Sequence, residues 1–145
     1  MLSSDDIDFS AIAFIGGSST VTAMNAATAP NGEVFVLGSG ASPTVTGFIK
    51  SGFAGDAVDL SSVLGAATAL PGSTSAFFGT SGVSLAVSGT ISNPNSTATL
   101  TINSGALGAA TTTSIALTLA SGSWGGSGTG FGSAEAQVYN LLLKG

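Results

Sequence analysis

The stretch VSLAVSGTI, Val83 to Ile91, decides the predicted fold of this chain. Its apolar residues Val83, Leu85 and Val87 alternate with small or hydroxylated ones, a period of two that is typical of a strand with one buried face. The turn-forming segment SNPNS follows, and STATLTI then predicts a partner strand that ends at Ile102. The two runs therefore predict a pair of strands joined by a turn.

Several other stretches have the composition of strands, and turn signals such as Asn31-Gly32 separate them. They are IDFSAIAFI (7–15), TVTAM (20–24), EVFVL (33–37), TVTGFIK (44–50), TTSIALTLA (112–120) and AEAQVYNLLL (134–143). Together they predict an all-β fold, an antiparallel sandwich or barrel of jelly-roll or immunoglobulin-like type with roughly eight short strands. At most one short helix is expected, and residues 55–72 are predicted to form either one helical turn or a covering loop.

The length of 145 residues is that of one domain. We expect residues 1–145 to form a single β domain with an N-terminal arm over about residues 1–17. The strand-like runs resemble one another only as half-buried strands do, and no exact internal repeat is visible.

Charge is scarce in this chain, and this favours assembly. Only 6% of the residues are charged, and none is charged between Leu60 and Ala134. Depletion of charge is typical of buried interfaces, and a core of small side chains needs extra burial from partner subunits. The alternative is a monomer coated with Ser and Thr and kept soluble by a net charge of −5.

The missing residue types exclude several functions. Lys50 and Lys144 are the only basic side chains, which excludes nucleic-acid binding and binding to an anionic membrane. Without Cys or His there is no disulfide, thiolate zinc site or Ser-His-Asp triad. The acidic start MLSSDDIDF is not a secretory signal peptide, so we expect an unprocessed protein made in the cytoplasm.

The glycine-rich stretch WGGSGTGFG, Trp124 to Gly132, fits no nucleotide motif. Its glycines alternate without the spacing of a dinucleotide fingerprint, and neither lysine completes a Walker A loop. It predicts a loop or an edge strand flanked by Trp124 and Phe131.

The carboxylates predict no catalysis. Asp5, Asp6 and Asp8 are predicted to form a solvent-exposed, solubilising N-terminal segment. Asp56 and Asp59 do not match a calcium-binding loop. A calcium site remains open only if the fold brings the two groups together. We therefore expect no enzyme, no catalytic residue and no cofactor.

The whole chain, small, acidic, free of Cys and His and rich in Gly, Ala, Ser and Thr, resembles bacteriophage capsid decoration (cement) proteins and other small virion proteins. The resemblance implies a virion location and two partners, a second copy of the chain and the major capsid or another virion protein. Such a protein stabilises the shell by adding buried area between subunits.

No functional residue is carried over from that family. The predicted interface comes instead from the two apolar ends of the chain and the aromatic residues of the glycine-rich region. Its residues are Ile7, Phe9, Ile12, Phe14, Trp124, Phe131, Val138, Tyr139, Leu141 and Leu143.

Two other functions remain open. An extracellular filament or tail tube would use DFSAIAFI to complete the sheet of the next subunit. A carbohydrate-binding β-sandwich would stack a sugar on Trp124, Phe131 and Tyr139.

Overall fold

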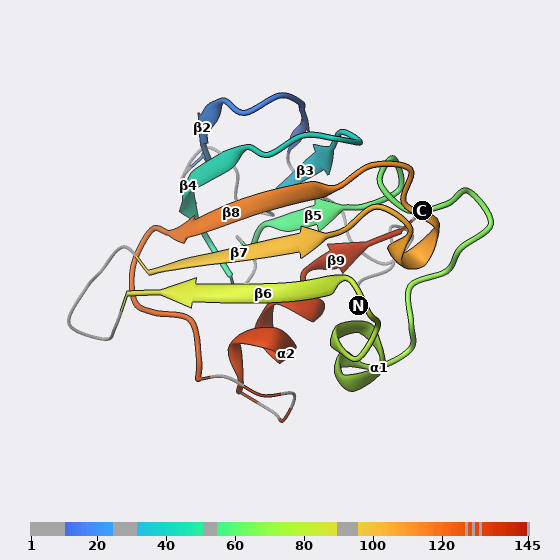
Figure 1. Cartoon of the computed structure of the whole chain (residues 1–145). Helices are drawn as coiled ribbons and strands as arrows, with labels where there is room; N and C mark the ends of the chain where they lie inside the picture. The colour runs from blue at the N-terminus through green and yellow to red at the C-terminus, as the bar shows by residue number, and fades with distance from the viewer. Residues whose placement is uncertain are drawn as a thin grey trace.

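The computed structural model describes residues 11–24, 32–50, 55–89, 96–126, 128, 130 and 132–144, and these form two β-sheets and two short α-helices (Figure 1). The four-stranded sheet has the order β1-β3-β5-β9 and the five-stranded sheet the order β2-β4-β8-β7-β6. The strands of the first are β1 Ala11–Ile15, β3 Glu33–Leu37, β5 Ala57–Asp59 and β9 Leu142–Leu143. Those of the second are β2 Thr20–Thr22, β4 Thr44–Phe48, β6 Val83–Ser88, β7 Thr97–Ile102 and β8 Thr113–Leu119. The helices are α1 Thr74–Phe78 and α2 Ala134–Tyr139, with a 3₁₀ turn η1 at Ala106–Gly108.

The first half of the chain alternates between the two sheets. A tight turn through Gly17 leads from β1 to β2, and a turn through Gly40 leads from β3 to β4; both glycines have positive φ, which other residues rarely adopt. β1 pairs in parallel with β3, and β2 in parallel with β4. We call β1 with β2 the first rung and β3 with β4 the second rung; β5 begins a third.

The rest of the chain departs from this winding. After β5 it forms α1 and the antiparallel pair β6–β7 before β8 returns to lie parallel to β4. β7 and β8 are antiparallel, in the register Thr97↔Thr118. After α2, β9 closes the four-stranded sheet in parallel with β5.

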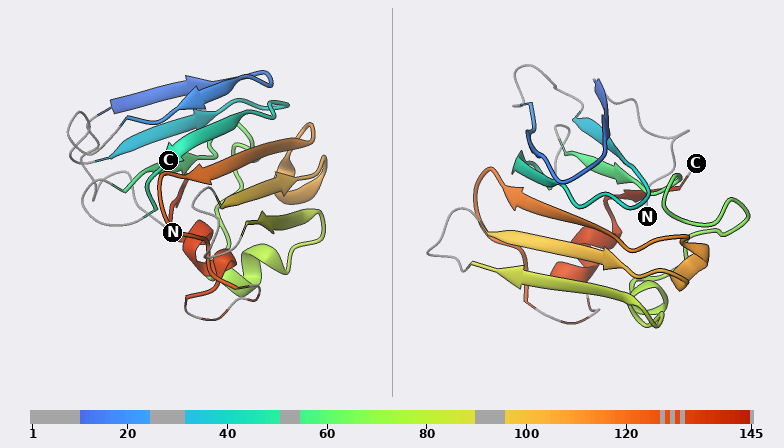
Figure 2. Two further views of the ribbon diagram at one scale, coloured as in Figure 1. Left: turned by 90° about the vertical axis from the view of Figure 1, so that its left-hand side faces the viewer. Right: turned by 45° about the horizontal axis from the view of Figure 1, so that its top comes forward.

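One hydrophobic core lies between the two sheets and extends under the helices. The rings of Phe35 and Phe48 meet across the sheets, with centroids 6.2 Å apart. The helices lie at the β6 end of the molecule, away from the first rung (Figure 2). There the ring of Phe77 in α1 lies 5.9 Å from that of Tyr139 in α2.

The prediction of an antiparallel all-β sandwich or barrel is wrong. The four-stranded sheet is wholly parallel, the five-stranded sheet is mixed, and there are two short helices. Alternation of apolar and small residues tells which face of a strand is buried, but it does not tell the direction of the neighbouring strand. The predicted pairing of 83–91 with the run that ends at Ile102 is confirmed as β6 and β7.

The terminal run AEAQVYNLLL, predicted as one strand, is also different. It begins with α2, because the Ser133 hydroxyl caps the helix by accepting a hydrogen bond from the Ala136 amide at 3.1 Å. Only Leu142–Leu143 is a strand. Residues 55–72, predicted as one helical turn or a covering loop, contain β5 followed by turns and loop, and the helix α1 comes after them.

Candidate functional site

The strands of the first rung, β1 and β2, are both edge strands, and they lie at the same end of the molecule. Within the residues that the structure describes, no strand pairs with their outer edges. The Ile15 carbonyl accepts from the Gly38 amide at 2.8 Å, and the Ala23 amide donates to the Thr46 carbonyl at 2.8 Å. The backbone N–H and C=O groups of the odd-numbered residues in both strands therefore point to the second rung.

Successive backbone groups of a strand point to opposite sides of it. The even-numbered residues, Ile12 and Phe14 in β1 and Thr20 and Thr22 in β2, thus direct their N–H and C=O groups away from the ladder. No described strand pairs with these groups, and an open edge of this kind is a ready template for another strand.

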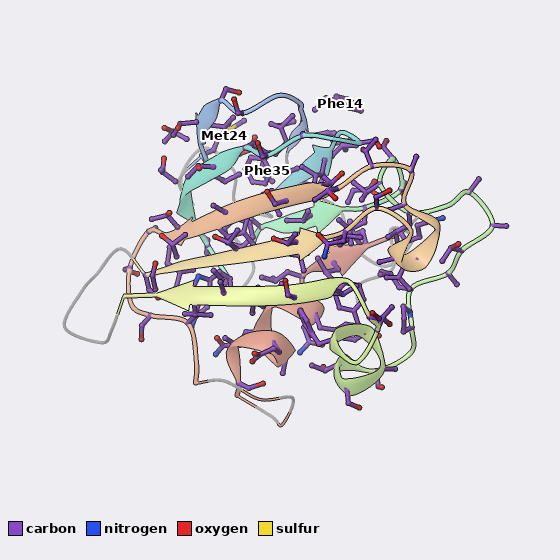
Figure 3. The ribbon with its side chains drawn as sticks, viewed as in Figure 1. Phe14, Met24 and Phe35 are labelled. Atoms are coloured by element: carbon purple, nitrogen blue, oxygen red, sulfur yellow. The ribbon has the colours of Figure 1, made fainter. Side chains whose placement is uncertain are left out.

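The side chains at this edge are apolar and exposed. Ile12 is 62% and Phe14 81% exposed, and Met24, just after β2, is 39% exposed. Figure 3 shows Phe14 and Met24 at the end of the molecule opposite the helices. Neither AIAFI nor TVT contains a charged residue or a proline, two devices that commonly protect edge strands. Among the described residues, β1 therefore forms an apolar edge without these devices, and β2 an uncharged edge of exposed threonines.

The inner side of the first rung only partly covers the core. Ala13 in β1 and Val21 in β2 both pack against the core cluster, and both remain partly exposed. They approach the core from opposite sheets. The end of the core thus lies between these two side chains.

Two buried carboxylates link successive rungs, one at the first residue of β3 and one directly before β5. Asp56, only 1% exposed, accepts from the amides of Glu33 and Ile49, both at 2.9 Å. Glu33, 5% exposed, accepts from the Met24 amide at 3.1 Å. Each acid thus accepts an amide from the end of the preceding rung.

Burial is the main cause that raises the pKa of Asp56 to about 6. The two amide hydrogen bonds act in the opposite direction, and the nearby charge of Glu33 adds to the rise. The fold therefore holds a carboxyl group that titrates close to neutral pH.

Glu33 and Asp56 occupy equivalent positions in successive rungs. They stand directly before Val34 and Ala57, which are partners in the β3–β5 ladder. In the first rung the partner of Glu33 is Ala11, a residue type without an acceptor. The acid is thus present where a preceding rung supplies an amide, and alanine stands where the described chain has no preceding rung.

The remaining candidate metal ligands accept hydrogen bonds from nearby groups or lie outside the described residues. Asp59 Oδ1 accepts from the amide and the hydroxyl of Ser61, at 2.8 and 2.5 Å. Asp5, Asp6 and Asp8 are outside the described residues. Among the residues described, no three carboxylates, or other common ligands, gather in a way that would hold a metal ion.

The ten predicted interface residues fall into three groups. Ile12 and Phe14 lie exposed on the edge strand β1. A second group is buried within the chain itself, with exposed fractions from 0% to 7%: Trp124, Val138, Tyr139, Leu141 and Leu143. Ile7, Phe9 and Phe131 lie outside the described residues.

The described residues of the glycine-rich stretch, 124–126, 128, 130 and 132, lie in no strand, and its two ends meet. A Cβ atom on Gly125 would lie 2.0 Å from the Gly132 carbonyl oxygen, so only glycine permits this approach. The Ala134 amide donates to the Gly126 carbonyl at 2.8 Å. The loop thereby brings the start of α2 against the core.

Lys50 closes the core beside this loop. Its ammonium group donates to the Ser123 carbonyl at 2.6 Å and lies 5.6 Å from the centroid of the Trp124 ring. Burial lowers the pKa of the Lys50 ammonium. The Trp124 indole N–H donates inward, to the Leu117 carbonyl at 3.0 Å, so this ring offers no open face to a sugar.

None of the helices described here is both long enough and apolar enough to cross a lipid bilayer. Comparisons of the chain with protein-family models, with curated proteins and with solved structures find no match. The candidate site, the outer edge of the first rung, therefore rests on its own geometry.

Proposed function

We propose that this protein is a structural subunit of an assembled particle, joined to its neighbours through the outer edge of the first rung. The observation that carries the proposal is the outer edge of β1, which no described strand covers, with Phe14 81% exposed on a strand that has no charged residue or proline. Pairing of such an edge removes apolar surface from water and satisfies backbone groups at the same time.

The particle we propose is a virion, with the protein as a capsid decoration protein or another minor shell component. The composition supports this placement: the chain is acidic, poor in charge and free of Cys and His. The protein would stabilise the shell through contacts between subunits, because each contact raises the free energy needed to separate them.

An extracellular filament or tail tube is the second candidate, because the same open edge suits growth by strand addition. The carbohydrate-binding alternative has less support, since the rings of Trp124 and Tyr139 are buried and the Tyr139 hydroxyl donates to the Pro71 carbonyl.

Light scattering of the purified protein over a range of concentrations tests the proposal. We expect a small closed oligomer, and we expect Phe14→Lys to be monomeric with unchanged far-UV circular dichroism, because residue 14 is exposed and its replacement leaves the core intact. The matched control is Val87→Lys, which places the same charge at an exposed position on β6, the edge strand of the five-stranded sheet farthest from β2. Long polymers would favour the filament, and a wild-type protein that stays monomeric at every concentration would overturn the proposal.

A further inference from the structure

We infer that the partner at the outer edge of the first rung is a second copy of this chain, related by a two-fold axis that passes beside Ala13 and Val21. The inference rests on the proposed function, because it specifies which partner the edge takes and in what orientation. A two-fold axis makes the interface self-complementary, so the same residues serve on both sides.

The backbone of β1 has the register that this pairing needs. A two-fold axis at Ala13 places Ile12 opposite Phe14 of the second copy and makes the strands antiparallel. Ile12 and Phe14 are the residues whose N–H and C=O groups point outward, so the two would exchange hydrogen bonds across the edge. Ala13 would then lie opposite its own copy as a pair that is not hydrogen-bonded.

The backbone of β2 meets the same condition independently. Its sequence, Thr20-Val21-Thr22, reads the same in both directions, so a two-fold axis at Val21 places Thr20 opposite Thr22 of the second copy. Both residues direct their backbone groups outward. Threonine already pairs with threonine across strands within the molecule, since the Thr46 hydroxyl donates to Thr22 Oγ1 at 3.3 Å.

The side chains fit one common axis. Ala13 and Val21 pack against the core from opposite sheets, and the inference places one axis, running from sheet to sheet, at both midpoints. On the inner side the two copies would close each other's half-covered core. On the outer side each exposed Ile12 would pack against Phe14 of its neighbour, an aromatic and β-branched pair of the kind that stabilises sheets.

A parallel rung of another molecule fits this edge less well. Within the chain, the acids Glu33 and Asp56 each accept an amide from the end of the preceding rung. The equivalent position of the first rung is Ala11, so the corresponding amide of a parallel newcomer would find no acceptor there. At the far end of the five-stranded sheet, β6 runs antiparallel to β7 and does not reproduce a rung. The first-rung edge therefore favours its own copy over a head-to-tail neighbour.

Disulfide trapping with Ala13→Cys tests the axis, since the natural chain has no cysteine. Opposed residues of a pair that is not hydrogen-bonded have Cα atoms about 4.5 Å apart, within the disulfide range. We expect Ala13→Cys to form a covalent dimer under mild oxidation, read on a non-reducing gel. Val21→Cys repeats the test on the other sheet, in case one variant folds poorly.

Ile12→Cys is the matched control, because residue 12 is more exposed than residue 13 but faces Phe14 of the second copy instead of its own copy. We expect Ala13→Cys to crosslink at least about tenfold faster than Ile12→Cys, owing to the effective concentration within the dimer. Equal or reversed rates would overturn the two-fold axis. If the wild-type protein forms oligomers but Ala13→Cys and Val21→Cys both fold and fail to crosslink, the two-fold axis is wrong and the proposed function stands. A monomeric wild-type protein would overturn the proposed function itself.

Discussion

Asp56 should make this protein less stable as the pH rises from about 4 to about 6. Its pKa moves from 3.8 in the unfolded chain to about 6 in the folded one, mainly through burial. Between these values the folded state keeps a proton that the unfolded state releases, so the free energy of unfolding falls as the pH rises. The stabilisation is complete below the unfolded pKa and is lost as the pH passes the folded pKa. At about 1.4 kcal/mol per pKa unit, the loss is about 3 kcal/mol.

Asp56→Asn should remove most of this dependence, because the amide does not titrate. The variant keeps an acceptor for the Glu33 amide, but its NH₂ group would face the Ile49 amide, donor against donor. We therefore expect it to be less stable than the wild type at pH 4, by about 1–3 kcal/mol. The gap should narrow towards neutral pH, where the wild type loses stability and the variant does not.

Urea unfolding, followed by the fluorescence of the single tryptophan, the buried Trp124, measures the free energy of unfolding at several pH values between about 4 and 7. All variants are compared in the Phe14→Lys background and at one protein concentration, so that assembly does not contribute. Asp59→Asn, which removes a carboxylate from β5, is the matched control and should keep the slope due to Asp56. A wild-type stability that rises from pH 4 to 6, or an unchanged slope in Asp56→Asn, would refute the reasoning.

Two further predictions concern the region around Trp124. Gly125→Ala should destabilise the protein by about 3 kcal/mol or more, because its Cβ would overlap the Gly132 carbonyl oxygen. The control Gly126→Ala has open space around the added atom and should change the urea midpoint little. Equal midpoints for the two variants would contradict the close approach of Gly125 and Gly132. Lys50→Met should cost about 1 kcal/mol and alter the Trp124 emission, because the ammonium group contacts the ring and donates to a carbonyl; an unchanged spectrum would show that this contact does not form in solution.

The sequence predicted strands better than it predicted their partners. The alternation in Val83–Ser88 and Thr97–Ile102 correctly indicated an antiparallel pair, because only a short turn-forming segment separates them. β1 and β3 have equally good strand composition, but they pair in parallel after the chain has passed through the other sheet. The pattern of apolar residues is the same in both arrangements, so it could not distinguish them, and the antiparallel prediction was wrong for β1 and β3.

The candidate site was predictable only in part. Ile12 and Phe14 were expected at an interface from the apolar N-terminal run, and they are exposed on an edge strand. The equally apolar C-terminal run is buried within the chain, because the Ser133 cap starts a helix that turns it into the core. The acids Glu33 and Asp56 stand apart in the sequence, and only the register of β3 and β5 places them in equivalent positions.

The sequence by itself determined the composition of the surface and of the core: few charges, small side chains, short strands with one buried face, and neither Cys nor His. Those properties follow from the chemistry of single residues and from local periodicity. The tertiary structure decided which strand lies beside which, that β1 and β2 end both sheets at one end of the molecule, and that Asp56 is buried between amides of different rungs. These features depend on contacts between residues far apart in the chain, which local periodicity does not encode.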